Sequence, residues 1–221
     1  MEMSREPAVE WERWLREWNG QLLARVDARE RDAFRDPAVT LEVIASGWLG
    51  FPGASEAQIA ELEARLGARL PPSYRSFLQA SNGFLQPGMI VPRLLPIAEV
   101  DWYRANHQDT IDSWTEGIAA VAGMPPRDPT AFEHHLPHAL QVSGVERVGS
   151  AVYLLNPDVV DAEGEWEAFY FAHWVPGVNR YPSFRALMLA EQASWLAPEP
   201  PPPPSQLKTF WEALRWAFRP N

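Results

Sequence analysis

The first 36 residues carry apolar side chains at helical spacing. Between residues 9 and 36, arginine and glutamate fill the intervening positions, and Asp36-Pro37 marks a stop. This pattern predicts an amphipathic helix, either packed against the rest of the protein or held out as a partner-binding arm. Exposure of its tryptophan side chains to water would be unfavourable in free energy, because each has a large apolar surface. The apolar positions are Trp11, Trp14, Leu15, Trp18, Leu22 and Val26.

Two shorter helices follow, joined by a proline-rich corner. Ser55 and Gln58 have the spacing of a capping box, and Gly67 ends the first helix. The chain restarts at residues 70–73, and the second helix is expected to end at Asn82-Gly83. The apolar faces consist of Ile59, Leu62 and Leu66 in the first helix and Tyr74, Phe77 and Leu78 in the second.

Beyond Gly83 the pattern changes to short apolar runs separated by proline, glycine and aspartate. Strands are predicted at residues 93–100, 139–145, 151–155 and 167–172, the last two joined by an acidic turn at residues 156–164. A final helix begins after Ser183, with Phe184, Leu187, Met188 and Trp195 facing inward. Helices, then strands, then a helix indicate an α+β fold rather than alternating βαβ units.

The C-terminal part starts with six prolines in the seven residues 198–204, which predict an extended spacer. Residues 205–218 carry Leu207, Phe210, Trp211, Leu214 and Phe218 at helical spacing. This helix either docks back on the core or is captured by a partner. The predicted organisation is an N-terminal helical extension (1–46), a main domain (47–197), a linker (198–204) and a C-terminal amphipathic helix (205–221).

The charge balance narrows the class of partner. The chain has 19 basic and 29 acidic residues, a net charge of −10. Nucleic acids and anionic membranes attract the opposite sign, so a basic protein is the expected partner. Cysteine is absent, residues 1–18 lack the apolar core of a secretion signal, and no run approaches the roughly 20 residues that span a bilayer. A cytoplasmic protein is expected.

Candidate catalytic chemistry is sparse. His134 and His138 have a spacing that would place both on one helix face for metal binding, but Pro137 breaks that helix. Residues 144–150 have glycines spaced as in a phosphate-binding loop, without the lysine that such a loop needs. There is no thiol nucleophile and no nucleophile elbow. We therefore expect no enzyme activity, no metal and no cofactor.

Acidic residues concentrate in two stretches that also contain aromatic side chains. Residues 99–116 have five acidic residues against Arg104 alone, and residues 148–179 have five acidic residues and no lysine or arginine. Solvated turns are one explanation. The other is a protein-binding patch, with aromatic anchors and with charge that steers a basic partner. The candidate partner-binding residues are Glu99, Asp101, Trp102, Asp158, Asp161, Glu163, Glu165, Trp166 and Glu167.

Several short motifs, in order and spacing, resemble one family. They are Trp48-Leu49-Gly50, Pro52-Gly53-Ala54-Ser55-Glu56, Ile59, Glu63, Leu66-Gly67, Leu70-Pro71, Tyr74, Phe77-Leu78, Asn82-Gly83, Leu94-Leu95-Pro96-Ile97, Val152-Tyr153-Leu154, Trp166 and Tyr181-Pro182-Ser183-Phe184. Over residues 47–196 the chain resembles the SMI1/KNR4 domain of the SUKH superfamily.

The resemblance implies an α+β fold with a mixed, largely antiparallel sheet flanked by helices, and a role in binding rather than catalysis. Many bacterial members are immunity proteins that bind and block a toxin domain, often a nuclease or deaminase. Fungal relatives are regulatory interaction proteins. The resemblance thus favours a bacterial immunity protein, with a regulatory or scaffold protein as the alternative.

Overall fold

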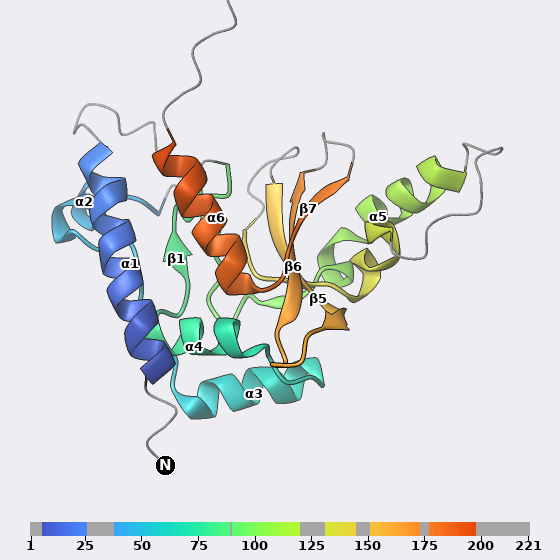
Figure 1. Cartoon of the computed structure of the whole chain (residues 1–221), viewed down its shortest axis with the longest axis horizontal. Coiled ribbons are helices and arrows are strands. Elements are labelled where there is room, and N and C mark those ends of the chain that lie inside the picture. The colour runs from blue at the N-terminus through green and yellow to red at the C-terminus, as the bar shows by residue number, and fades with distance from the viewer. Residues whose placement is uncertain are drawn as a thin grey trace, which may run out of the picture.

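The computed structural model describes residues 6–25, 38–88, 90–119, 131–144, 151–172 and 177–197. Its centre is an antiparallel sheet of five strands in the order β3-β4-β5-β6-β7, which is also their order along the chain (Figure 1). The strands are β3 (Asp101–Trp102), β4 (Leu140–Gln141), β5 (Ala151–Val160), β6 (Trp166–Ala172) and β7 (Val178–Tyr181). A separate two-stranded ribbon pairs β1 (Phe84–Leu85) with β2 (Arg93–Leu94).

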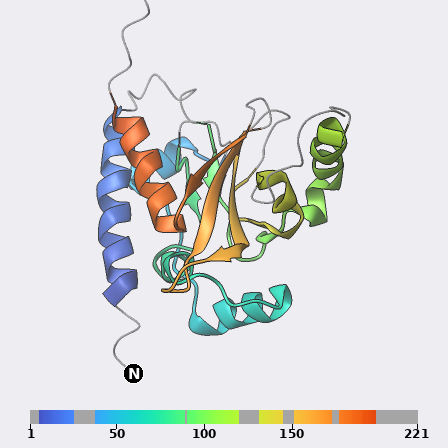
Figure 2. The same cartoon turned by 45° about the vertical axis from the view of Figure 1, so that its right-hand side comes forward.

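Both faces of the sheet are covered, which explains why its central strands are apolar at nearly every position. Along β5, Ala151, Tyr153 and Leu155 contribute to one core, and Val152 and Leu154 contribute to the other. Successive side chains of a strand point to opposite faces, so each face receives alternate residues. The result is a helix–sheet–helix arrangement (Figure 2).

Helices from both ends of the sequence cover the first face. These helices are α1 (Glu6–Arg25), α3 (Glu56–Leu66), α4 (Pro72–Ala80) and α6 (Phe184–Leu196), with the short α2 (Leu41–Ser46) beside them. In both views α1 and α6 run side by side (Figures 1 and 2). The opposite face is covered by α5 (Arg104–Ala119) and the 3₁₀ turns η2 (Phe132–His134) and η3 (Leu136–His138).

The N-terminal helix is packed, which confirms the first of the two alternatives. Its Leu15, Trp18 and Leu22 are buried in the main core. The indole Nε1–H of Trp11 donates to Ser76 Oγ on α4 at 3.1 Å. The helix ends at Arg25, and the rest of the segment predicted as helical, residues 26–36, lies outside the described residues.

Local capping chemistry is found where the sequence predicts it. Ser55 Oγ accepts from the backbone amide of Gln58 and the Gln58 side chain accepts from the amide of Ser55, which completes the capping box of α3. Gly67 closes α3 in the left-handed region at φ 68°. Ser183 caps α6 by accepting from the amide of Ala186 at 3.1 Å.

Other predictions need correction. The strand expected at residues 93–100 is wrong beyond Leu94, because Pro96 has no amide to donate and a turn follows at residues 97–99. The acidic turn is shorter than expected, since β5 continues to Val160. Residues 104–119 form α5, which was not predicted; its backbone is non-helical at His107. The predicted linker and C-terminal helix lie outside the described residues.

Candidate partner-binding surface

The end of the β5–β6 hairpin carries six of the nine candidate residues. The two strands pair regularly from Ala151 and Ala172 to Asn156 and Glu167, and the register then shifts before Val160 pairs with Trp166. Three residues of β5, 157–159, therefore have no counterpart on β6, and they form a bulge. The bulge leaves Val159 42% exposed and Val160 51% exposed.

The turn that follows the bulge is shaped by Asp161. Its Oδ1 accepts from the backbone amide of Glu163 at 3.0 Å and from that of Glu165 at 2.8 Å. Gly164 completes the turn at φ 83°, a conformation that a residue with a Cβ rarely adopts. The side chain of Glu163 is exposed and forms no ion pair with any residue that the structure describes.

Asp158, at the centre of the bulge, is held by two histidines. Its Oδ2 lies 2.9 Å from His135 Nδ1 and 3.0 Å from His138 Nδ1. Burial alone would raise the pKa of Asp158, but the hydrogen bonds from the two imidazoles outweigh it and hold that pKa below its usual range. The bulge is thereby tied to η3, on the far side of the sheet from α4.

Glu165 and Glu167 tie the same hairpin to other elements. Glu165 accepts from the amide of Ser73 at 2.8 Å and from its hydroxyl at 2.7 Å, at the positive N-terminal end of α4. Glu167 accepts from Arg180 Nε at 2.6 Å and from Asn156 Nδ2 at 3.0 Å. Burial tends to raise the pKa of Glu167, yet these hydrogen bonds leave it lowered.

The other candidate residues lie around β3. Glu99 pairs with Arg93 at 2.9 Å, and Asp101 lies 3.9 Å from Arg65. Trp102 stacks on Trp166 with ring centroids 6.5 Å apart and an interplanar angle of 15°.

The two acidic stretches, distant in sequence, thus meet through their tryptophans. Trp166 is only 7% exposed, so it supports the surface rather than presenting itself, while Trp102 is partly exposed.

The net charge of the hairpin end remains negative despite this bonding. Asp158, Asp161, Glu163 and Glu165 have no lysine or arginine partner within the described residues. Asp158 is bonded to two imidazoles, and Asp161 and Glu165 are bonded to backbone amides and a hydroxyl. Hydrogen bonds from backbone amides and a hydroxyl fix the carboxylates of Asp161 and Glu165 without cancelling their charge. The surface can therefore attract a basic partner from a distance.

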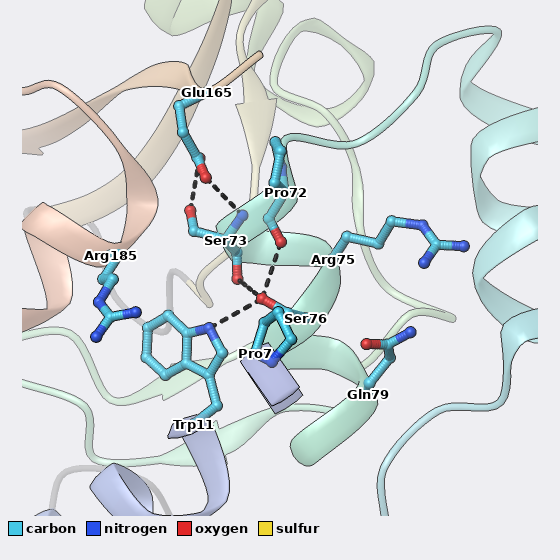
Figure 3. Close-up of a pocket in the computed structure, with 9 residues that line it drawn as sticks. All are labelled: Pro7, Trp11, Pro72, Ser73, Arg75, Ser76, Gln79, Glu165 and Arg185. Atoms are coloured by element: carbon cyan, nitrogen blue, oxygen red, sulfur yellow. Dashed lines mark hydrogen bonds between the residues drawn. The ribbon is translucent and has the colours of Figure 1, made fainter. Parts of the chain in front are cut away.

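A pocket of about 300 Å³ adjoins the hairpin turn (Figure 3). Glu165 enters it from above and bonds Ser73, and Arg75, at its side, is paired with Glu56 and Glu63. Arg185 pairs with Glu10 at 2.9 Å. These pairings occupy the charged groups, and the chemistry of the pocket favours no particular ligand class. The lining residues are Pro7, Trp11, Pro72, Ser73, Arg75, Ser76, Gln79, Glu165 and Arg185.

The structural roles of Ser73, His135 and His138 are not visible in the sequence. Ser73 and Glu165 are 92 positions apart, and no local pattern connects them. The sequence does single out a histidine cluster, but it pairs His134 with His138, whereas the structure brings His135 and His138 together. Within the described ranges, no group of three or more potential ligands could hold a metal ion.

No helix among the described residues combines the length and apolarity needed to cross a membrane.

Comparison with known proteins identifies the family. No curated protein matches the chain. The model of the SMI1 / KNR4 family (SUKH-1) matches residues 53–176, more than half of the 221 residues. On this match, and on its α+β fold with an antiparallel sheet, the chain belongs to the SMI1/KNR4 (SUKH-1) family.

Proposed function

We propose that this protein is a bacterial immunity protein of the cytoplasm, which binds and neutralises a cognate toxin domain of the nuclease or deaminase type without catalysis of its own. Membership of the SMI1/KNR4 family supports the proposal, since that family includes immunity proteins. The partner-binding surface consists of the hairpin end and the segment around Trp102.

One observation carries the proposal: a negatively charged hairpin end next to exposed apolar side chains. An enzyme that acts on nucleic acids needs a basic surface for phosphates, and an acidic inhibitor can use that same surface. Complementary charge accelerates association, while apolar and aromatic contacts determine how long the complex lasts. Glu163 and Asp161 supply exposed charge, and Val159, Val160 and Trp102 supply apolar contact.

Co-expression with the products of the flanking genes tests the proposal. We expect one of them to be a toxin whose isolated domain stops growth, and we expect growth to be restored by this protein and the two to co-purify. The association rate measured by surface plasmon resonance should fall with added salt. Glu163→Gln, which removes an exposed charge from this surface, should slow association, whereas the matched control Glu12→Gln, at an exposed charge on α1, should associate as the wild type does. Absence of both protection and complex formation with either flanking product would contradict the proposal.

A further inference from the structure

Exposed Val159 and Val160 lie at a bulge of β5, residues 157–159, that is anchored by hydrogen bonds from two histidines, and the proposed function does not explain this anchoring. We propose that Val159 and Val160 are the apolar centre of the partner contact, and that His135 and His138 are positioning residues that hold this edge in place through Asp158. The inference rests on the proposed function, and it specifies the partner surface as basic with an apolar recess.

The exposure of the two valines is the first observation. Val159 and Val160 are adjacent, 42% and 51% exposed, and both are β-branched. β-branched side chains have few rotamers to lose when a partner covers them. They are followed at once by Asp161 and Glu163, which have no lysine or arginine partner within the described part of the chain. Apolar contact surrounded by negative charge is complementary to a basic surface.

The anchoring of the bulge is the second observation. Residues 157–159 lack ladder partners on β6, and Pro157 has no amide to donate. The hydrogen bonds from His135 and His138 to one carboxylate oxygen replace the missing ladder constraint. The ring of His135 also packs against Phe169, with centroids 6.3 Å apart, so the donor itself is fixed.

Rigid anchoring of an exposed apolar edge has a physical use in binding. A loop that is ordered before association loses less conformational entropy when the complex forms, so the complex is tighter for the same contacts. A bulge of three residues without this anchor would sample other conformations. The two histidines therefore act on binding through Asp158, and they do not need to touch the partner.

The first experiment uses the free protein. We compare hydrogen exchange at the amides of Asp158 and Asp161 in His135→Leu/His138→Leu and in His135→Asn/His138→Asn. The Asn amide nitrogen takes the place of the imidazole Nδ1–H donor, so this pair should keep wild-type exchange, whereas the Leu pair should exchange roughly tenfold faster or more. His134→Leu, at the exposed neighbour of the cluster, is the control.

The second experiment measures binding to the toxin domain that protects growth in the co-expression test. Val159→Ser/Val160→Ser should weaken binding roughly tenfold or more, mainly through faster dissociation. Val9→Ser, at a 59% exposed valine on α1, is the matched control and should bind as the wild type. The His→Leu pair should weaken binding as well, and the His→Asn pair should restore it.

The outcomes separate the two proposals. If the wild type binds the toxin domain but the double serine variant binds equally well, the contact is wrong and the proposed function stands. Unchanged exchange and binding in the His→Leu pair would refute the positioning role. If the wild type binds neither flanking product, the proposed function fails and the contact fails with it, while the exchange measurement still decides whether the histidines order the bulge.

Discussion

A single half-buried carboxyl group, that of Glu191, links α6 to the central sheet. The hydroxyl of Tyr153, itself fully buried, donates to Glu191 Oε2 at 2.7 Å. The backbone of Gly88 lies against both groups, and a Cβ there would be 2.4 Å from each of the two oxygens. Burial raises the pKa of Glu191 and outweighs the opposing hydrogen bond from Tyr153.

This raised pKa predicts a pH dependence of stability. The native state holds the proton of Glu191 to a higher pH than the unfolded chain does, so the contribution is complete below the unfolded pKa and is lost as pH rises through the folded pKa. Glu191→Gln, neutral at every pH, should match the wild type near pH 4 and exceed it at pH 8. Urea unfolding at both pH values measures the difference.

Tyr153→Phe is the companion variant, because it removes the hydroxyl that offsets the burial of Glu191. The free energy of unfolding of Tyr153→Phe should therefore fall more between pH 4 and pH 8 than that of the wild type. Parallel pH profiles for the wild type and Glu191→Gln would contradict the assignment.

Gly53 sits where no side chain fits. A Cβ at this position would lie 1.8 Å from the backbone carbonyl oxygen of Gln79, and backbone cannot move aside as a flexible side chain can. Gly53→Ala should therefore lower the free energy of unfolding by about 2 kcal/mol or more, measured by urea denaturation. Gly20→Ala, at an exposed position of α1 with open space around it, should instead raise the free energy of unfolding by about 0.5–1 kcal/mol. Equal effects of the two changes would refute the steric argument.

The first helix is attached to the rest of the fold by more than apolar packing. The side-chain amide of Asn19 donates to the carbonyl of Gly47 at 2.7 Å and accepts from the amide of Leu49 at 2.8 Å. Asn19 is 5% exposed and Leu49 is buried, so the amide of Leu49 depends on this side chain. The helix that precedes residue 53, where the family match begins, is thus an integral part of the fold.

Removal of this amide tests that attachment. Asn19→Ala leaves the buried amide of Leu49 without its acceptor and removes the bond to Gly47, so it should lower the free energy of unfolding by about 1–3 kcal/mol. Glu12→Ala, on the exposed face of α1, should change it by less than about 0.5 kcal/mol. In calorimetry, Asn19→Ala should unfold in a single cooperative transition whose midpoint temperature is shifted as a whole. A separate early transition for α1 alone would contradict its integral role.

We propose that residues 205–218 dock on the folded core. Isolated helices of about 14 residues are marginal in water, so the apolar positions Phe210, Trp211 and Leu214 need cover. Removal of residues 198–221 should lower the melting temperature, and a loss of 1 kcal/mol corresponds to roughly 2–4 °C at this size. Replacement of the three apolar residues by serine should have the same effect. An unchanged melting temperature in both variants would instead leave this segment free for a partner.

The periodic elements were predictable because their physics is local. Ser55 and Gln58 form a capping box with each other, and Gly67 ends its helix by its own backbone freedom, whatever the rest of the protein does. The strands β5 and β6 were predictable for a different reason, because burial on both faces leaves a nearly continuous apolar run in the sequence. Strand β3 and helix α5 were missed, since β3 has two residues and α5 is polar over much of its length.

Composition and order of motifs determined the acidic character, the fold class and the family from the sequence alone. Which carboxylates are bonded, and to what, was decided only by the tertiary structure. The candidate residues in the hairpin could be named, but the anchors Ser73 and His135 belong to segments far away in sequence, and they meet the hairpin only because α4 and η3 pack at its end. The hydrogen-bond partners of a carboxylate are the groups that lie near it in space, and which segments lie near one another across a sheet depends on the packing of the whole chain.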